Sequence, residues 1–271
     1  MKYNLQDFTF LIPIRLDSIE RLENITCTTR LILKDFVTNI MVLEASKGTN
    51  DFLKRMLPKN VTYKWILDDD PVFYRTHYLN KMTLGASTKF ICIWDADVVL
   101  NKQQIIKSAS LLRENRADMV YPYSGVFLNI PDPIREEFIR HPNIQLLERN
   151  YKKMPDLYNS KNLKGGAIMV NKEKYMECGL ENEGFYGWGP EDFERYDRWK
   201  AFNCRIERVD GRLYHLEHPR DLNGHFNSTN QMEMANALLE RIRLSTDNEI
   251  RNNISARSGI LHSWNEIIKR L

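Results

Sequence analysis

The sequence has few cysteines and no long apolar run. Its four cysteines, Cys27, Cys92, Cys178 and Cys204, are far apart and form no CxxC pair, so neither a zinc site nor a disulfide framework is expected. No stretch approaches the roughly 18 apolar residues that a membrane-spanning helix needs, and the first residues have too short an apolar core for a signal peptide. These absences predict a cytoplasmic protein, and peripheral contact with the inner face of a membrane stays open.

An excess of charge of either sign is also missing. The 39 basic and 36 acidic residues give a formal net charge of +3, which offers no general reason to expect a nucleic acid partner. The sequence contains no internal repeat and no low-complexity linker. Its 271 residues, 42% of them hydrophobic, are enough for one large α/β domain or one domain with a small appendage.

The first hundred residues alternate between two patterns. Continuous apolar runs predict buried strands, and segments of helical periodicity separate them. Strands that alternate with helices indicate βαβ crossovers and a mostly parallel sheet, which binds ligands beyond the carboxyl ends of its strands. The predicted strands are residues 8–14, 39–45, 61–67 and 89–94, and the predicted helices are residues 19–36, 74–86 and 102–114.

The pattern loosens in the second half of the chain. We predict one charged helix over residues 132–149 and a strand pair within 204–217 that turns at Asp210-Gly211. The chain from residue 231 onward is expected to be helical and to pack on the rest. Short strands are predicted at residues 119–123, 125–130 and 166–170, a loop at 181–190 and a helix at 191–202.

Two aspartates stand directly after the predicted strand of residues 89–94. Asp95 and Asp97 are separated by one alanine, and two such carboxylates repel each other unless a positive charge lies between them. Mg²⁺ and Mn²⁺ supply that charge, prefer oxygen ligands and often share them with substrate phosphates. The pair therefore indicates a metal–phosphate site, although aspartates are also common in turns that end strands.

Two enzyme classes place such a pair after a strand. In phosphatases of the haloacid dehalogenase class the first aspartate, here Asp95, is a nucleophile. In glycosyltransferases of the GT-A fold the pair holds a metal on the diphosphate of a nucleotide-sugar. A non-catalytic module that binds the nucleotide or sugar on the same fold is a third alternative.

A second group of distinctive residues stands at 164–194. Pro190 suits the start of a helix, and Glu191 and Asp192 suit its first turn, where the helix dipole favours anions. A helix start does not explain the glycines and the tryptophan, Trp188, that precede it. Aromatic faces and carboxylates commonly hold sugars, and a carboxylate there can take a proton from an acceptor hydroxyl.

Taken together, these segments resemble the β-1,4-galactosyltransferases and the bacterial chondroitin-type polymerases. Pro190 stands where that group has a second glycine. The similar pieces occur in the order of the group over about residues 8–220. They are residues 10–18, residues 73–82, Asp95-Ala96-Asp97, Gly165-Gly166 and Tyr186-Gly187-Trp188-Gly189-Pro190-Glu191-Asp192.

The resemblance implies an α/β fold of the GT-A type, Rossmann-like, with a mostly parallel central sheet flanked by helices. The catalytic domain would span residues 1–225, with a nucleotide-binding half at about 1–115 and an acceptor-binding half at about 116–225. A helical extension would follow at 226–271.

The implied activity is the transfer of a hexose or N-acetylhexosamine from a UDP-sugar to a hydroxyl of a glycan or glycolipid, in polysaccharide biosynthesis. Mn²⁺ or Mg²⁺ would be the cofactor. Inversion at the anomeric carbon is expected, while retention and the identity of the donor sugar stay open.

The resemblance also assigns roles to single residues. Asp97 would be the main metal ligand, with Asp95 nearer to the ribose or the metal. Asp192 would be the general base, and Glu191 would bond the sugar or the acceptor. The residues expected to contact the nucleotide-sugar are Pro13, Arg15, Arg75, Asp95, Gly166 and Trp188.

Two histidines, His215 and His218, follow where the resembling group supplies a histidine to the metal. Neutral imidazole suits Mn²⁺ better than Mg²⁺, which favours Mn²⁺. The galactosyltransferase motif favours His218, whereas the motif of the polypeptide N-acetylgalactosaminyl transferases favours His215. On one straight strand the two side chains would face opposite sides, so we expect only one to bind unless the chain bends.

Overall fold

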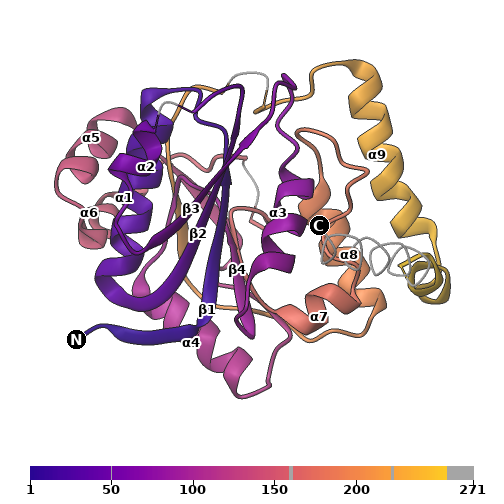
Figure 1. The fold of residues 1–271 in the computed structure, drawn as a ribbon. Helices are drawn as coiled ribbons and strands as arrows, with labels where there is room; N and C mark the ends of the chain where they lie inside the picture. The colour runs from indigo at the N-terminus through magenta and orange to yellow at the C-terminus, as the bar shows by residue number, and fades with distance from the viewer. Residues whose placement is uncertain (50, 159–160, 221–222, 255–271) are drawn as a thin grey trace.

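The computed structural model describes residues 1–49, 51–158, 161–220 and 223–254 (Figure 1). Within these ranges a seven-stranded sheet has the order β3-β2-β1-β4-β8-β6-β9. Its pairings are parallel except for those of β8, which runs antiparallel to both β4 and β6. The strands are β1 (Tyr3–Ile14), β2 (Phe36–Ser46), β3 (Val61–Leu67), β4 (Phe90–Trp94), β6 (Met119–Tyr121), β8 (Ala167–Asn171) and β9 (Ile206–Arg208).

Helices cover both faces of this sheet. Figure 1 shows α1, α5 and α6 on one side and α3, α7 and α8 on the other, with α9 outside α8. This is the predicted α/β architecture of the GT-A type. The helices are α1 (Ile19–Asp35), α2 (Phe52–Met56), α3 (Arg75–Gly85), α4 (Lys102–Arg113), α5 (Asp132–Arg140), α6 (Ile144–Asn150), α7 (Lys172–Glu177), α8 (Glu191–Ala201) and α9 (Thr229–Leu244), with a 3₁₀ turn at Tyr151–Lys153.

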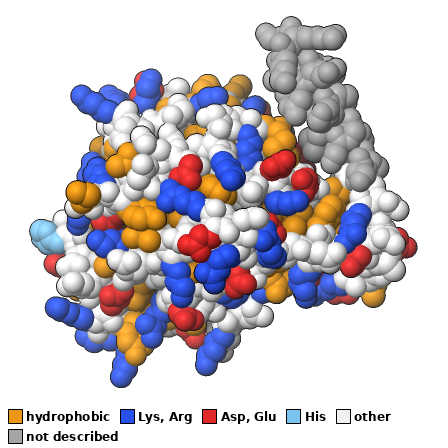
Figure 2. Space-filling view, turned by 90° about the horizontal axis from the view of Figure 1, so that it is seen from below, with side chains coloured by type: hydrophobic (Ala, Val, Ile, Leu, Met, Phe, Trp, Pro, Cys, Tyr) orange, Lys and Arg blue, Asp and Glu red, His pale blue; other side chains and the backbone are white. Residues whose placement is uncertain are grey.

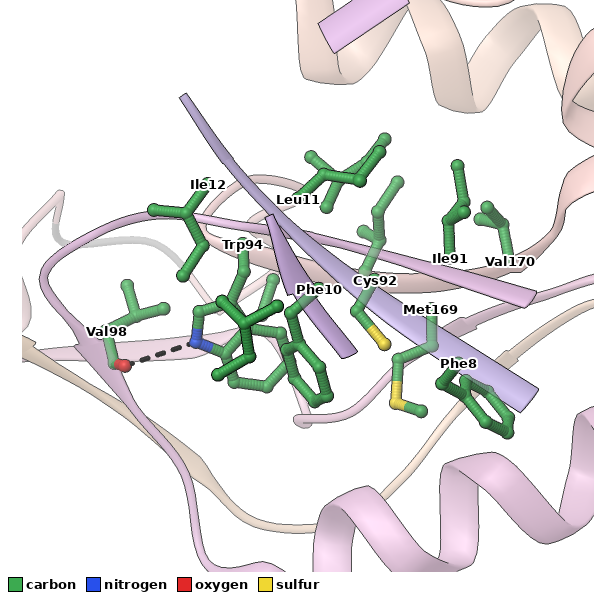
Figure 3. Close-up of a cluster of buried hydrophobic side chains, with 14 of the residues drawn as sticks. Phe8, Phe10, Leu11, Ile12, Ile91, Cys92, Trp94, Val98, Met169 and Val170 are labelled. Atoms are coloured by element: carbon green, nitrogen blue, oxygen red, sulfur yellow. Dashed lines mark hydrogen bonds between the residues drawn. The ribbon is translucent and has the colours of Figure 1, made fainter. Parts of the chain in front are cut away.

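Buried hydrophobic side chains cluster where β1 and β4 lie side by side (Figure 3). Phe8 stacks on Phe90 with ring centroids 4.7 Å apart, and Phe10 meets Trp94 edge-on at 5.1 Å. Every residue of β4 is buried. The indole Nε1 of Trp94 donates to the carbonyl oxygen of Val98 at 3.3 Å. The core therefore fixes both ends of the turn that contains the two aspartates.

A small second sheet lies beyond that turn. It has the order β5-β10-β7, where β5 is Val98–Val99, β7 is Val126–Ile130 and β10 is Arg212–Leu216. Strand β10 runs parallel to β7 and antiparallel to β5. The prediction that the strands on either side of Asp210-Gly211 pair with each other is therefore wrong. A turn signal marks a change of direction and does not choose the partner, and here β9 joins β6 in the large sheet while β10 joins the small one.

The predicted helix over residues 132–149 is two helices, α5 and α6. Pro142 lies between them, and proline lacks the backbone N–H that a continuous helix needs. The side chain of Asn143 accepts from the backbone N–H of Gln145 and caps α6. The chain therefore restarts a helix directly after the proline.

The beginning of the expected C-terminal extension is helical. Helix α9 packs against α8, and residues 247–254 are helical as well. The rest of the expected extension, residues 255–271, lies outside the described residues. Over the part that is described, no helix combines the length and the apolar character needed to cross a lipid bilayer.

Candidate active site

The residues predicted to form the site line one cavity of about 570 Å³. It opens beyond the carboxyl ends of the parallel neighbours β1 and β4, where ligands bind in sheets of this kind. Their individual roles stay predictions, although all of them lie at the same cavity. They are Pro13, Arg15, Arg75, Asp95, Asp97, Gly166, Trp188, Glu191, Asp192, His215 and His218.

Asp97 and the two histidines form a group whose ligand atoms lie within 4.8 Å of one another. Nε2 of His218 is 3.0 Å from Oδ2 of Asp97, and Nε2 of His215 is 3.9 Å from Oδ1. The exposed fraction of each of these side chains is 10% or less. One carboxylate and two imidazoles thus converge in a nearly dry corner of the cavity.

The small sheet brings His215 to Asp97. Its residue pairing sets His215 opposite Val98, next to the aspartate, and the N–H of Leu216 donates to the Asp97 carbonyl at 2.7 Å. Strand β10 ends at Leu216, so His218 lies beyond it. Because no single straight strand runs through both histidines, their side chains can reach the same aspartate, which is the exception expected for a chain that bends.

Both imidazoles are held in a defined tautomer. Nδ1 of His218 lies 2.7 Å from the carbonyl oxygen of Pro219, and Nδ1 of His215 lies 2.7 Å from Oδ1 of Asn129. A carbonyl oxygen only accepts, so in each ring Nδ1 carries the proton and donates. Nε2 is then the nitrogen of each ring that lies beside the carboxylate of Asp97.

Burial acts to raise the pKa of Asp97, but the positive charge of a protonated His215 and the hydrogen bond and charge of His218 outweigh it and hold that pKa below its usual value. Burial lowers the pKa of His215 to about 4. At neutral pH the group is therefore a carboxylate with a neutral imidazole at His215.

Asp95 takes a different partner from Asp97. Its Oδ1 accepts from Nη2 of Arg75 at 2.7 Å, and its backbone N–H donates to the carbonyl of Gly166 at 2.9 Å. Burial raises the pKa of Asp95 although Arg75 opposes the rise. The two aspartates thus differ, since Asp97 faces the histidines and Asp95 faces an arginine.

Gly166 stands at a position that only glycine fills without strain. Its φ is +81°, and a Cβ there would lie 2.5 Å from Cε2 of Phe127 and 2.8 Å from Cδ1 of Leu213. We expect Gly166→Ala to lower the free energy of unfolding by about 1–3 kcal/mol, through backbone strain and overpacking. Urea denaturation measures this. Gly48→Ala, where a Cβ meets nothing within 4 Å, is the control, and equal stability of both variants would contradict the argument.

The segment before α8 supplies an aromatic wall. The ring of Trp188 meets that of Phe226 edge-on at 4.8 Å. Nε2 of Gln231, on α9, donates to the carbonyl oxygens of Tyr186 at 2.9 Å and Trp188 at 3.3 Å. The start of the C-terminal extension therefore contributes to this wall rather than only packing behind it.

Glu191 is a buried carboxyl group with an unused acceptor. Among the residues that the structure describes, none makes a hydrogen bond to its Oε2, and its Oε1 lies 3.9 Å from Nη1 of Arg75. Burial, followed by the neighbouring Asp192, raises the pKa of Glu191 to about 8. A buried polar atom without a partner costs free energy, so this oxygen is suited to a hydroxyl group that enters the cavity.

Asp192 is held from two sides. Its Oδ1 accepts from Nη2 of Arg195, one turn further along α8. A Cβ built on Gly165 would lie 2.5 Å from its Oδ2. The missing side chain of Gly165 therefore makes room for the carboxylate at the edge of the cavity.

Arg15 lines the cavity, but most of its guanidinium N–H groups already donate hydrogen bonds within the protein. Its guanidinium donates to the carbonyl oxygens of Ala45, Asp70 and Pro71 and to the carboxylate of Asp68. We infer that it braces the wall between the ends of β1 and β3.

Asn129 and Arg195 are among the residues of the site that the sequence analysis missed. Asn129, on β7, orients His215. The two residues come together only because β7 pairs with β10, which is far away in the sequence. Arg195 could have been found, because a residue three positions after Asp192 on a helix lies on the same face.

Residues 147–219 match the family described as the N-terminal domain of galactosyltransferase. The chain is also 36% identical over 55 residues to β-1,4-galactosyltransferase 7 of Mus musculus and of Homo sapiens. That alignment covers 20% of this chain and 17% of each relative, so the chain matches only a small part of their length.

Solved structures resemble the chain over most of its length. Drosophila β-1,4-galactosyltransferase 7 with xylobiose has a TM-score of 0.53 at 19% identity, covering 84% of this chain and 79% of that one. The structure of its mutant with manganese, UDP-Gal and xylobiose has a TM-score of 0.51 at 18% identity. That match covers 82% of this chain and 77% of the mutant. A mannosyltransferase from Pyrobaculum calidifontis, with GDP-Man and Mn²⁺, has a TM-score of 0.52 at 10% identity. That match covers 98% of this chain and 81% of the mannosyltransferase. The chain therefore has the GT-A glycosyltransferase fold, with a galactosyltransferase-type segment at residues 147–219.

Proposed function

We propose that this protein is a metal-dependent glycosyltransferase that moves a hexose or N-acetylhexosamine from a UDP-sugar to a hydroxyl of a glycan. The observation that carries the proposal is the group of Asp97, His215 and His218 at the cavity that also contains Trp188 and Asp192. An inverting, metal-dependent transferase uses a cation for the diphosphate and a base for the acceptor, and this cavity offers residues for both.

The donor atoms of the proposed metal site fit Mn²⁺. Two imidazole Nε2 atoms and one carboxylate lie close enough together to share a single cation. Each ring donates its other N–H to a carbonyl oxygen, which is the usual arrangement of histidines that bind metals. Imidazole nitrogens with one carboxylate suit Mn²⁺ better than Mg²⁺. When bound, the ion would stabilise the negative charge that develops on the departing diphosphate.

The residues on the other side of the cavity support the transfer step. Asp192 would accept the proton of the acceptor hydroxyl through the oxygen that Arg195 leaves free. Oε2 of Glu191 would accept a hydrogen bond from a sugar hydroxyl, and the ring of Trp188 would pack on the sugar. The acceptor oxygen would attack the anomeric carbon from the side opposite UDP, so the new glycosidic bond would form as the bond to the diphosphate breaks, UDP would leave, and the configuration would invert.

The donor and the acceptor are inferred from similar proteins as well as from the site. The Drosophila galactosyltransferase structure contains manganese, UDP-Gal and xylobiose. We therefore propose a UDP-sugar donor and a glycan acceptor for this chain. Asp95 and Arg75 would lie near the ribose and the phosphates, with Pro13 near the base.

Transfer is tested by UDP release. The protein is incubated with Mn²⁺, a series of UDP-hexoses and UDP-N-acetylhexosamines, and a panel of mono- and disaccharide acceptors. One donor and acceptor pair should release UDP faster than that donor alone, with a glycoside of matching mass. Metal-dependent UDP binding without turnover would instead favour a binding module, and phosphate release from p-nitrophenyl phosphate with Asp95 as nucleophile would favour a phosphatase.

A further inference from the structure

We propose that Arg195, anchored by the buried Glu181, is a positioning residue that fixes the orientation of the Asp192 carboxylate. The proposal rests on the proposed role of Asp192 as the base. It assigns a function to a buried ion pair that the metal and donor sites do not use.

Arg195 is almost fully buried and its contacts are directed. The exposed fraction of its side chain is 1%. Nη1 donates to both carboxylate oxygens of Glu181, at 2.7 and 2.9 Å, and Nη2 donates to Oδ1 of Asp192. Because a guanidinium is planar and rigid, fixing one of its nitrogens on Glu181 also fixes the direction of the other.

Glu181 is in turn fixed on its own side. Its side chain is fully buried, and its Oε1 accepts from the hydroxyl of Tyr175 at 2.5 Å. Its backbone N–H donates to Oδ1 of Asn80, on α3, at 2.8 Å. Tyr175, Glu181 and Arg195 therefore form a chain of contacts that begins in the core and ends at the cavity.

The opposite oxygen of Asp192 has little freedom. A Cβ on Gly165 would come within 2.5 Å of Oδ2, so the carboxylate fits between the guanidinium and the backbone of Gly165. Rotation of the carboxylate would break the contact with Arg195 or press on that backbone. One oxygen is thus bound to Arg195, and the other lies beside Gly165, which lines the cavity together with Asp192.

The charges around Asp192 show what Arg195 adds. Two anionic or potentially anionic groups, Asp95 and Glu191, interact with Asp192, and the guanidinium of Arg75 interacts with it as well. Arg75 is already bound to Asp95. Arg195 therefore supplies the direct charge-assisted hydrogen bond that keeps Asp192 in place.

The main test is Arg195→Lys. It keeps the positive charge but removes the planar guanidinium that binds Glu181 with one nitrogen and Asp192 with the other. We expect kcat for transfer to fall about 10- to 100-fold, because small misplacements of a catalytic group have effects of this size. The KM for the acceptor and the affinity for UDP with Mn²⁺ should stay within about threefold. Arg198→Lys is the matched control, since Arg198 is equally buried on α8 and binds Glu194 without touching Asp192.

A double variant separates positioning from a general structural role. If Arg195 acts through Asp192, Arg195→Lys should cause no further loss in an Asp192→Asn background. Gly165→Ala should lower kcat in the same way while leaving the Glu181–Arg195 pair intact. Additive losses in the double variant, or equal losses in Arg195→Lys and Arg198→Lys, would overturn the proposal.

These outcomes differ from a failure of the proposed function. If the wild-type protein transfers no sugar from any UDP-sugar, the assignment of Asp192 as a base fails first. If the wild type is active and Arg195→Lys retains its kcat, only the positioning role is lost.

Discussion

Asp97→Asn is expected to abolish the metal-dependent part of UDP binding. Asp97 is the carboxylate that two imidazoles face, and an amide oxygen carries no negative charge to hold a divalent cation. Loss of outer partners alone costs metal sites about 10–100-fold in affinity. We therefore expect UDP affinity in the presence of Mn²⁺ to fall at least about 100-fold, measured by calorimetry with and without the ion.

Asn129→Ala supplies a graded comparison for this experiment. It leaves the three ligand atoms in place and removes only the oxygen that orients His215. An effect near tenfold is expected, smaller than that of Asp97→Asn. Unchanged Mn²⁺-dependent UDP binding by the Asp97 variant would mean that the ion, if one binds, is held elsewhere.

Asp192→Asn is expected to slow sugar transfer by about 10²- to 10⁴-fold, the usual contribution of a general base. An asparagine oxygen can still accept from Arg195, so the loop and α8 should keep their arrangement. What is lost is the ability to take a proton from the acceptor. The rate is measured as glycoside product formed under saturating donor and acceptor.

UDP binding is the internal control for the Asp192 variant. Asp192 belongs to α8, while the proposed metal ligands lie after β4 and at β10. The Asp192→Asn protein should therefore bind UDP and Mn²⁺ within about threefold of the wild type. An undiminished transfer rate would show that another group accepts the proton.

The sequence predicted the features that depend on local pattern. The apolar run ending at Trp94 marks a buried strand, and the two aspartates after it can be recognised as a candidate site from the sequence alone. The acids after Pro190 were likewise recognisable as a helix start. In both places the signal lies within a few residues of the site it identifies.

Features that depend on distant pairing could not be predicted in this way. The convergence of both histidines requires β10 to pair with the two-residue strand β5, which is too short to give a pattern. The part that α9 plays at the cavity depends on Gln231 reaching loop carbonyls far away in sequence. Such contacts follow from tertiary packing and leave no local periodicity.

The small sheet has a consequence for the order of events when an ion arrives. The hydrogen bond from Leu216 to the Asp97 carbonyl joins two distant parts of the chain, and the entropy of closing that long loop is lost during folding. Binding of a cation would then cost little further conformational entropy, which favours tight binding. The small sheet would therefore hold Asp97 and His215, two of the three proposed metal ligands, in place as part of the fold itself.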